Sequence, residues 1–236
     1  ETNNIINFIK NKSNKKKVLD FKNKKVLVTA GPTIEAIDEV RYISNHSSGK
    51  QGYLIAEEFA NHGAEVILVS GPVGLKPPNK VNLYNVNTAD EMLEISLKCL
   101  PVDIAVFVAA VADWKVEKPY PGKIKKQNNS MTLNFEKNPD ILQYISNHKM
   151  RPNLVVGFSA ETEKIEENSR KKLMQKGCDW ILGNVVGKKT SVFGSDNNQI
   201  VFISEKNIEK WPKLYKSEVA VKLLEKVRNH FKNYND

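Results

Sequence analysis

Residues 26–33 read VLVTAGPT, and this stretch begins the part of the chain that decides the fold. A polar loop follows to Ser47-Ser48-Gly49, then a helical pattern to His62, then a second apolar run, VILV at 66–69. A strand, a loop, a helix and another strand, in that order, predict two parallel strands joined by a helix. Apolar runs and helical patterns alternate along the rest of the chain. We therefore expect an α/β fold with a Rossmann-like, mostly parallel sheet flanked by helices.

The loop after the first strand is longer than the G-x-G-x-x-G turn that binds dinucleotides. It extends from Gly31 to the small residues Ser47, Ser48 and Gly49, at the predicted start of a helix. Small residues there let backbone N–H groups and the positive helix end approach phosphate closely. A serine that caps the helix, with glycines for packing, explains the same residues equally well. The length of the loop argues against NAD as the ligand. The residues at its end fit either a phosphate-binding helix start or a simple helix cap.

Hydrophobic periodicity predicts strands at 26–30, 65–70, 81–86, 103–109, 154–158, 179–183 and 199–203, and helices at 49–62, 89–99, 139–148, 165–176 and 217–231. Thr88 and Glu91 predict a capping box. Asn138 and Pro139 predict the N-cap and the first position of the next helix. Residues 113–137 show no helical pattern, and an alternating run near their end predicts an inserted hairpin, or lid, appended to the sheet.

Composition and charge limit the classes of function. The chain has 236 residues, of which 40% are hydrophobic and 27% charged, as in soluble globular proteins. The net charge is +9, but residues 1–25 hold eight lysines against two acids. This weakly periodic segment predicts a solvated linker over 1–24 and a folded domain over 25–236, with a nucleic-acid-binding arm as the weaker alternative. We expect no nucleic-acid or membrane partner, since no basic aromatic sheet or long apolar run is present.

The two cysteines and the first residues bear on the compartment. Cys99 and Cys178 are far apart and form no C-x-x-C pair, which indicates free thiols in a reducing cytoplasm. The chain begins at Glu1 with a polar, lysine-rich segment and no signal-peptide pattern. We therefore expect a fragment of a longer cytoplasmic protein.

Polar residues beyond the carboxyl ends of the predicted strands are the candidates for chemistry, because ligands bind there in open α/β sheets. Arg41 could pair with a carboxylate or phosphate, and Asn45 could hold a carbonyl oxygen. If Arg41 and Asn45 are considered as isolated residues, stabilisation of the loop is the simpler explanation for each of them. The small residues from Ala109 to Asp113 would let a flat base lie against the backbone, with Asp113 reading an amine or a ribose hydroxyl. A tight core crossover is the alternative for this segment.

Lysines gather in two places. The run KIKK at 123–126 forms a cationic arm, and Lys172 and Lys176 share one helical face. Each group alone is typical of a solvated surface, but together around a cleft they fit a triphosphate with Mg²⁺. Phe158 could pack against a base or belong to the core.

Several catalytic motifs are absent from the sequence. It contains no G-x-x-x-x-G-K-[ST], no G-x-S-x-G and no paired-histidine metal motif. No general base or nucleophile stands out, and the metal ligands cannot be assigned. This pattern favours a reaction carried by positioning and charge neutralisation, as in nucleotidyl transfer.

A series of motifs in a fixed order makes the chain resemble the phosphopantothenoylcysteine synthetase domain of bacterial coenzyme A biosynthesis, over about residues 24–231. The motifs are VTAGPT (28–33), DEVR (38–41), ISNHSSGK (43–50), SGPV (70–73), AAVAD (109–113), KIKK (123–126), KNPDI (137–141), VGF (156–158), AET (160–162) and FGSDNN (193–198). Residues 1–24 resemble the linker that follows a flavin-dependent decarboxylase domain. The resemblance thus implies that domain on the same full-length chain, and no FMN on this part of it.

The resemblance implies a homodimer and a CTP-dependent ligation, with Mg²⁺, of 4′-phosphopantothenate to L-cysteine through an acyl-cytidylate. It implies that Asn45 holds this intermediate and that Arg41 helps to bind the substrate or intermediate. Lys123 would neutralise phosphate charge from a flexible lid, and the hairpin around 113–137 would contribute to the lid and the dimer. The positions that match nucleotide contacts of the family are Phe107, Val108, Ala109, Asp113, Lys123, Pro139, Asp140, Ile141, Leu142, Phe158, Lys172 and Lys176, with Ser47, Ser48 and Gly49 near the phosphates.

Two alternatives remain. An ATP-using ligase of the same family differs only in the nucleotide, and a NAD(P)-binding reductase is disfavoured by the long first loop. The chain departs from the family pattern at Gln51, Trp114, Ser159 and residues 183–185. These departures affect local packing and details of the base pocket, and remove no proposed catalytic group.

Overall fold

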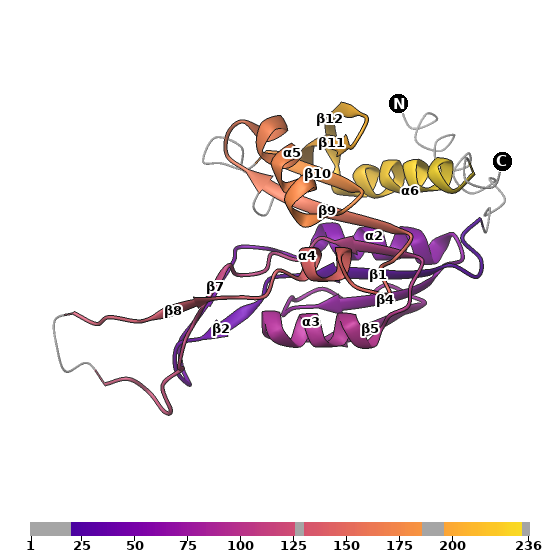
Figure 1. Ribbon diagram of the computed structural model, residues 1–236. Coiled ribbons are helices and arrows are strands. Elements are labelled where there is room, and N and C mark those ends of the chain that lie inside the picture. Colours follow the sequence, from indigo (N-terminus) through magenta and orange to yellow (C-terminus); the bar gives the residue numbers. More distant parts are fainter. Residues whose placement is uncertain (1–19, 126–129, 186–195, 233–236) are drawn as a thin grey trace, which may run out of the picture.

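The computed structural model describes residues 20–125, 130–185 and 196–232 (Figure 1). Its centre is an eight-stranded sheet in the order β12-β11-β10-β9-β6-β1-β4-β5. These strands are β1 (Lys25–Ala30), β4 (Glu65–Ser70), β5 (Val81–Asn85), β6 (Ile104–Phe107), β9 (Leu154–Glu161), β10 (Trp180–Val185), β11 (Asn197–Ser204) and β12 (Ile208–Tyr215). Six neighbouring strands of this sheet, in the order β10-β9-β6-β1-β4-β5, pair in parallel. The predicted α/β fold with a mostly parallel sheet is confirmed.

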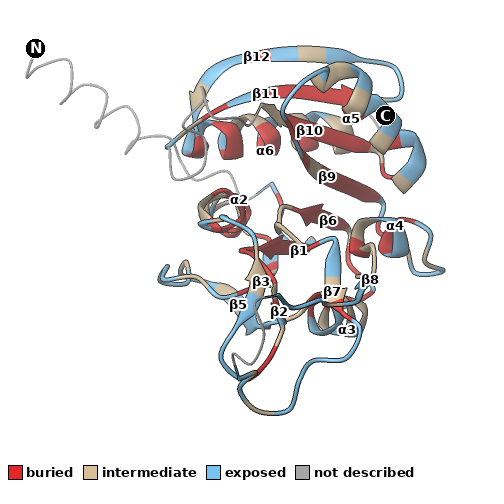
Figure 2. Ribbon diagram, turned by 90° about the vertical axis from the view of Figure 1, so that its left-hand side faces the viewer, coloured by how far each residue is buried: buried red, intermediate tan, exposed pale blue. Residues whose placement is uncertain are grey.

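Helices cover both faces of the sheet. On one face lie α2 (Lys50–Asn61) and α6 (Lys216–Lys232), and on the other lie α3 (Ala89–Lys98), α4 (Ile141–Ser146) and α5 (Ile165–Lys176). Successive residues of a strand point to opposite faces, so Val26 and Val28 pack with the α2–α6 layer while Leu27 packs with the other. The central strands are therefore buried on both sides, as Figure 2 shows in red.

The connections reverse direction at β1. The chain runs from β1 through α2 to β4 on one side, and after β5 it returns through α3 to β6 on the other side. Helix termini and loops diverge at such a point, so a crevice forms beyond the carboxyl ends of β1 and β6. This crevice is where the candidate residues meet.

The structure differs from the sequence prediction at strand β12 and at the start of α4. The edge strand β12 was not predicted, because Pro212 and the lysines around it obscure the alternation of an edge strand. It pairs antiparallel with β11, as β11 does with β10. Asp140, rather than Asn138, caps α4 and accepts a hydrogen bond from the Gln143 N–H at 3.0 Å. Asn138 instead donates to the Ala112 carbonyl at 2.8 Å.

The described fold begins before Lys25, where the sequence placed the end of the linker. Phe21 is 3% exposed and packs edge-on against Phe59, with ring centroids 5.2 Å apart. Its N–H donates to the His62 carbonyl at 3.1 Å. Residues 1–19 of the predicted linker lie outside the described residues. Among the helices of the described residues, none has the length and apolar character that crossing a bilayer requires.

An arm extends from the sheet on the side of the crevice (Figure 1). It contains two short antiparallel pairs, β2 (Ile34–Ala36) with β3 (Tyr42–Ser44), and β7 (Trp114–Val116) with β8 (Phe135–Lys137). The second pair is the predicted hairpin, but its attachment to the central sheet was wrong, since β7 and β8 pair only with each other. The first pair was not predicted, because three-residue strands are too short to produce an alternating signal.

Candidate active site

A cavity of about 850 Å³ opens at the carboxyl ends of the central strands. Thr29 of β1, the segment 107–113 after β6, and Phe158 of β9 line it. The loop before α2 and the first residues of α4 complete the wall. Its position coincides with the reversal of the connections at β1, where open α/β sheets bind their ligands.

The start of α2 forms one side of the cavity. Gly49 is the N-cap residue, with φ +71°, and as a glycine it has no side chain to cap the helix, while Ser48 Oγ accepts from the Lys50 N–H at 3.5 Å. A Cβ at Gly49 would lie 2.8 Å from Val73 Cγ1, so both the left-handed backbone and the packing require glycine. Ser47 Oγ accepts a hydrogen bond from the Gly49 N–H at 3.3 Å, outside the helix. Gly49, rather than a serine, therefore occupies the N-cap position, and the positive helix end at the cavity suits an anion.

The backbone after β6 is held by side chains of the first strand and its loop. Thr29 Oγ1 accepts from the N–H groups of Val108 and Ala109 at 3.2 and 3.3 Å. Asn45 Nδ2 donates to the Ala110 carbonyl at 2.9 Å. Because a carbonyl can only accept, this contact fixes the amide orientation and turns Asn45 Oδ1 away from Ala110. The long first loop thus carries an oriented amide to the mouth of the crevice.

The opposite side of the cavity comes from α4, β9 and α5. Lys176 forms an ion pair with Asp140, and Lys172 Nζ lies 2.7 Å from Glu161 Oε1. Most of the residues predicted from the sequence lie in this one cavity: Asn45, Ser47, Ser48, Gly49, Phe107, Val108, Ala109, Asp113, Pro139, Asp140, Ile141, Leu142, Phe158, Lys172 and Lys176. The structure thus brings together residues from five separate sequence segments.

The charge of the cavity is positive. Five lysines line it, at positions 50, 137, 172, 176 and 216, against two aspartates, at 113 and 140. Within the described residues, no group of three or more histidines, cysteines or acidic side chains is suited to hold a metal ion. An excess of cations in a cleft favours an anionic ligand with several charges.

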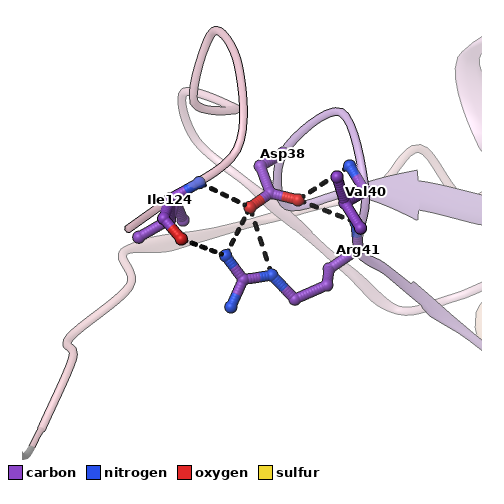
Figure 3. Close-up of polar contacts among 4 residues, drawn as sticks. All are labelled: Asp38, Val40, Arg41 and Ile124. Atoms are coloured by element: carbon purple, nitrogen blue, oxygen red, sulfur yellow. Dashed lines mark hydrogen bonds and ion pairs between the residues drawn. The ribbon is translucent and has the colours of Figure 1, made fainter. Parts of the chain in front are cut away.

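Arg41 and Lys123 are not among the residues that line the cavity. The Arg41 guanidinium binds the buried Asp38 carboxylate through Nε and Nη2, and Nη2 also donates to the Ile124 carbonyl at 3.2 Å. Asp38 accepts in addition from the N–H groups of Val40, Arg41 and Ile124, as Figure 3 shows. These contacts tie the segment that contains Lys123 to the turn between β2 and β3. Lys126, at the end of the same run, lies outside the described residues.

The polar residues of the cavity wall that the sequence reasoning did not assign to the site include Gln51, Asn184, Asn198 and Lys216. Lys216 is 7% exposed, and burial, followed by the charge of Lys50, lowers the pKa of its ammonium group. Asn198 belongs to a motif that the resemblance used. No spacing in the sequence connects it with Lys216, since only the pairing of β11 with β12 places the start of α6 beside it.

Comparisons with known proteins agree with this architecture. The family described as DNA/pantothenate metabolism flavoprotein C-terminal domain matches residues 21–231. The coenzyme A biosynthesis bifunctional protein CoaBC of Borreliella burgdorferi is 39% identical over 223 residues, which cover 93% of this chain and 56% of that protein. The CoaBC of Escherichia coli K12 is 44% identical over 187 residues, covering 78% and 46%. The chain thus spans about half the length of these relatives.

Solved structures show the same fold. The crystal structure of the C-terminal domain of CoaBC has a TM-score of 0.77 and 36% identity, covering 91% of this chain and 98% of that one. A variant of Cab2, described as a complex with phosphopantothenate-cysteine, has a TM-score of 0.72 and 20% identity, covering 91% and 89%. The eight-stranded sheet and its helical layers are therefore an architecture seen in experimental structures.

Proposed function

Since the chain belongs to the family of DNA/pantothenate metabolism flavoprotein C-terminal domains, we propose that it ligates 4′-phosphopantothenate to L-cysteine in coenzyme A biosynthesis. CTP is the proposed nucleotide, and phosphopantothenoylcysteine, CMP and pyrophosphate are the products, formed in the cytoplasm. The observation that carries the proposal is the cavity itself, which joins the N-terminus of α2 to the oriented amide of Asn45. A ligase of this kind must hold a triphosphate and an acyl group side by side.

The proposed reaction has two steps. A carboxylate oxygen of phosphopantothenate attacks the α-phosphorus of CTP, and the bond to the β-phosphate oxygen breaks to release pyrophosphate. The amine of cysteine then attacks the acyl carbon, CMP leaves, and the amine loses its proton to solvent. Asn45 holds the acyl-cytidylate between these steps through its second Nδ2 hydrogen, which donates to an acyl or phosphate oxygen while the first is bound to Ala110. An amide suits this role because it contacts the mixed anhydride without adding charge beside its phosphate.

The remaining residues of the cavity divide between the phosphates and the base. Ser47, Ser48 and Gly49 place the start of α2 near the phosphates, and Lys172 and Lys176 supply positive charge. The small residues after β6, with Phe158 and the start of α4, form the apolar surface for the base. We propose that Mg²⁺ is held mainly by the phosphates and by water, because the described lining residues form no acidic cage for it.

Arg41 and Lys123 need a further element to reach the substrate, since neither lines the cavity of its own chain. In the proposed enzyme the arm brings both side chains to the substrate, because it acts as a lid and contributes to a homodimer. Exposed apolar side chains on the arm support the dimer: Val40, Tyr42, Trp114, Tyr120, Met131 and Phe135 are each between 46% and 59% exposed. Apolar groups concentrated on a projecting segment are typical of a surface that another chain covers.

The test is pyrophosphate release by the purified protein with phosphopantothenate, cysteine and each nucleoside triphosphate in turn. We expect release with CTP and little with ATP. Equal release with both would favour the ATP-using alternative, and no release with either would refute the ligase. Formation of the amide product, followed by mass spectrometry, checks the second step separately.

A further inference from the structure

One wall of the cavity contains polar groups to which the proposed reaction assigns no task. Lys216 is 7% exposed and Asn198 is 3% exposed, and both line the cavity. Within the described ranges, the Lys216 ammonium has no hydrogen bond or ion pair shorter than 4 Å, and Asn198 Oδ1 has no hydrogen-bond partner. A buried polar atom without a partner costs free energy unless a ligand or water completes its bonding.

The orientation of the Asn198 amide follows from a chain of contacts. The Lys216 carbonyl accepts a hydrogen bond from Gln51 Nε2 at 3.0 Å, because a carbonyl cannot donate. Gln51 Oε1 must then be the acceptor for Asn198 Nδ2, at 2.9 Å. The remaining atom, Asn198 Oδ1, is therefore an acceptor that has no protein donor among the described residues.

The backbone of Lys216 is fixed from both sides. Its N–H donates to the Asp196 carbonyl at 2.8 Å, and its own carbonyl accepts from Gln51. The lysine therefore starts α6 from a fixed backbone position, and its side chain, buried for the most part, lines the cavity. A cation held in this way loses little further freedom when a ligand binds.

The local charge selects an anion as the ligand. Lys50 lies near enough to Lys216 to repel its ammonium group, and Asp196, the carboxylate nearby, is already paired with Lys50. Lys50 is also the first residue of α2, whose positive end lines the same cavity, with its own N–H donating to Ser48 Oγ at 3.5 Å. Two lysines and one carboxylate beside a helix N-terminus leave net positive charge for a phosphate group.

We propose that Lys216, with Lys50 and Asn198, binds a phosphate group of a substrate at this wall of the cavity. Phosphate oxygens accept hydrogen bonds from the Lys216 ammonium, and water of the phosphate hydration shell donates to Asn198 Oδ1. The proposal rests on the ligase function, and two substrates carry the required chemistry. These are the triphosphate tail of the nucleotide and the phosphate of phosphopantothenate.

The test compares the wild-type chain with Lys216→Met by isothermal titration calorimetry. The titrants are CTP, CMP, inorganic pyrophosphate and phosphopantothenate. The substitution keeps the apolar stem and removes a buried charge, so we expect an unchanged or higher Tm. Lys213→Met, at an exposed position of β12 outside the cavity, is the matched control with the same change in net charge. Lys216→Gln serves as a second variant if Lys216→Met does not fold.

A loss of at least about tenfold in affinity for CTP and pyrophosphate, with CMP unchanged, would assign the site to the triphosphate tail. The same loss for phosphopantothenate alone would assign it to the acyl substrate. Equal affinities of wild type and both Lys216 variants for every titrant, or no binding by the wild type, would overturn the proposal. Turnover is measured separately, so failure of the ligase assignment shows in pyrophosphate release, independently of these affinities.

Discussion

At the scale of the residue, the proposed role of Asn45 depends on its amide having a hydrogen-bond donor as well as an acceptor. Its Nδ2 donates to the Ala110 carbonyl at 2.9 Å, a bond that a carboxylate cannot make. Asn45→Asp would place two acceptors against each other and a negative charge beside the acyl phosphate. We expect kcat/KM for amide formation to fall roughly 10- to 100-fold, the effect of one lost and one repulsive polar contact. Single-turnover measurement of both steps checks this, and an unchanged rate would contradict it.

The two thiols differ in environment, which makes their reactivity predictable. Burial raises the pKa of the Cys178 thiol to about 12, and burial also raises the pKa of the less buried Cys99. Since the thiolate is the reactive form, Cys178 should be alkylated at pH 8 on the order of 10³-fold more slowly in the folded protein than after unfolding in urea. Peptide mass spectrometry after iodoacetamide treatment measures this. Comparable rates in both states would show that Cys178 is accessible.

At the scale of the element, the Asp38 carboxylate joins the β2–β3 turn to the segment that carries Lys123. The Arg41 guanidinium, and next the Ile124 N–H, hold the pKa of Asp38 well below its usual range. The stabilisation is therefore complete above the ordinary carboxyl pKa and is lost only as the pH falls through the lowered folded value. At neutral pH the arm should remain tied to the turn.

Asp38→Asn should release this part of the arm while leaving the sheet intact. The amide of Ile124, which donates to Asp38 at 3.0 Å, should exchange with deuterium roughly tenfold faster than in the wild type. Hydrogen exchange with mass spectrometry over residues 117–125 measures it. Asp20→Asn, which removes a carboxylate paired with Arg228 outside the arm, is the control and should leave this exchange unchanged.

At the scale of the whole molecule, the positions of Arg41 and Lys123 outside the cavity allow two arrangements. Either the arm closes over its own cavity, or it reaches the cavity of a second copy in the proposed dimer. Mixing Asn45→Asp chains with Lys123→Gln chains distinguishes them. If the arm acts on the partner, half of the dimers regain one intact site, and about a quarter of wild-type activity should return. If it acts within its own chain, mixing restores none.

That experiment requires the dimer to form and to exchange chains. Analytical ultracentrifugation should show a dimer for the wild type. Phe135→Glu, which charges a residue that is 46% exposed on the arm, should shift the equilibrium toward the monomer. A monomeric wild type would contradict the proposed assembly.

The strands and helices of the body could be predicted because their signals are local. The runs at 26–30 and 66–69 are apolar on both faces, and Thr88 caps α3 by accepting from the Glu91 N–H at 3.2 Å. The short pairs of the arm and the edge strand β12 could not be predicted, since their side chains are partly exposed and their pairing is set by distant segments. The predicted cap at Asn138 was wrong because its amide bonds to Ala112 instead.

The sequence by itself determined the alternating fold, the long first loop and the polar residues beyond the strand ends, because periodicity and residue type act over a few neighbours. Only the tertiary structure decided which of these residues meet. It placed Asn45 against Ala110, tied Arg41 to Asp38 away from the cavity, and brought Lys216 to the cavity wall beside Asn198. The Arg41–Asp38 pair is local, but the contacts of Asn45 with Ala110 and of Asp38 with Ile124 join residues 65 and 86 positions apart, and the packing of the layers fixes these rather than any local pattern.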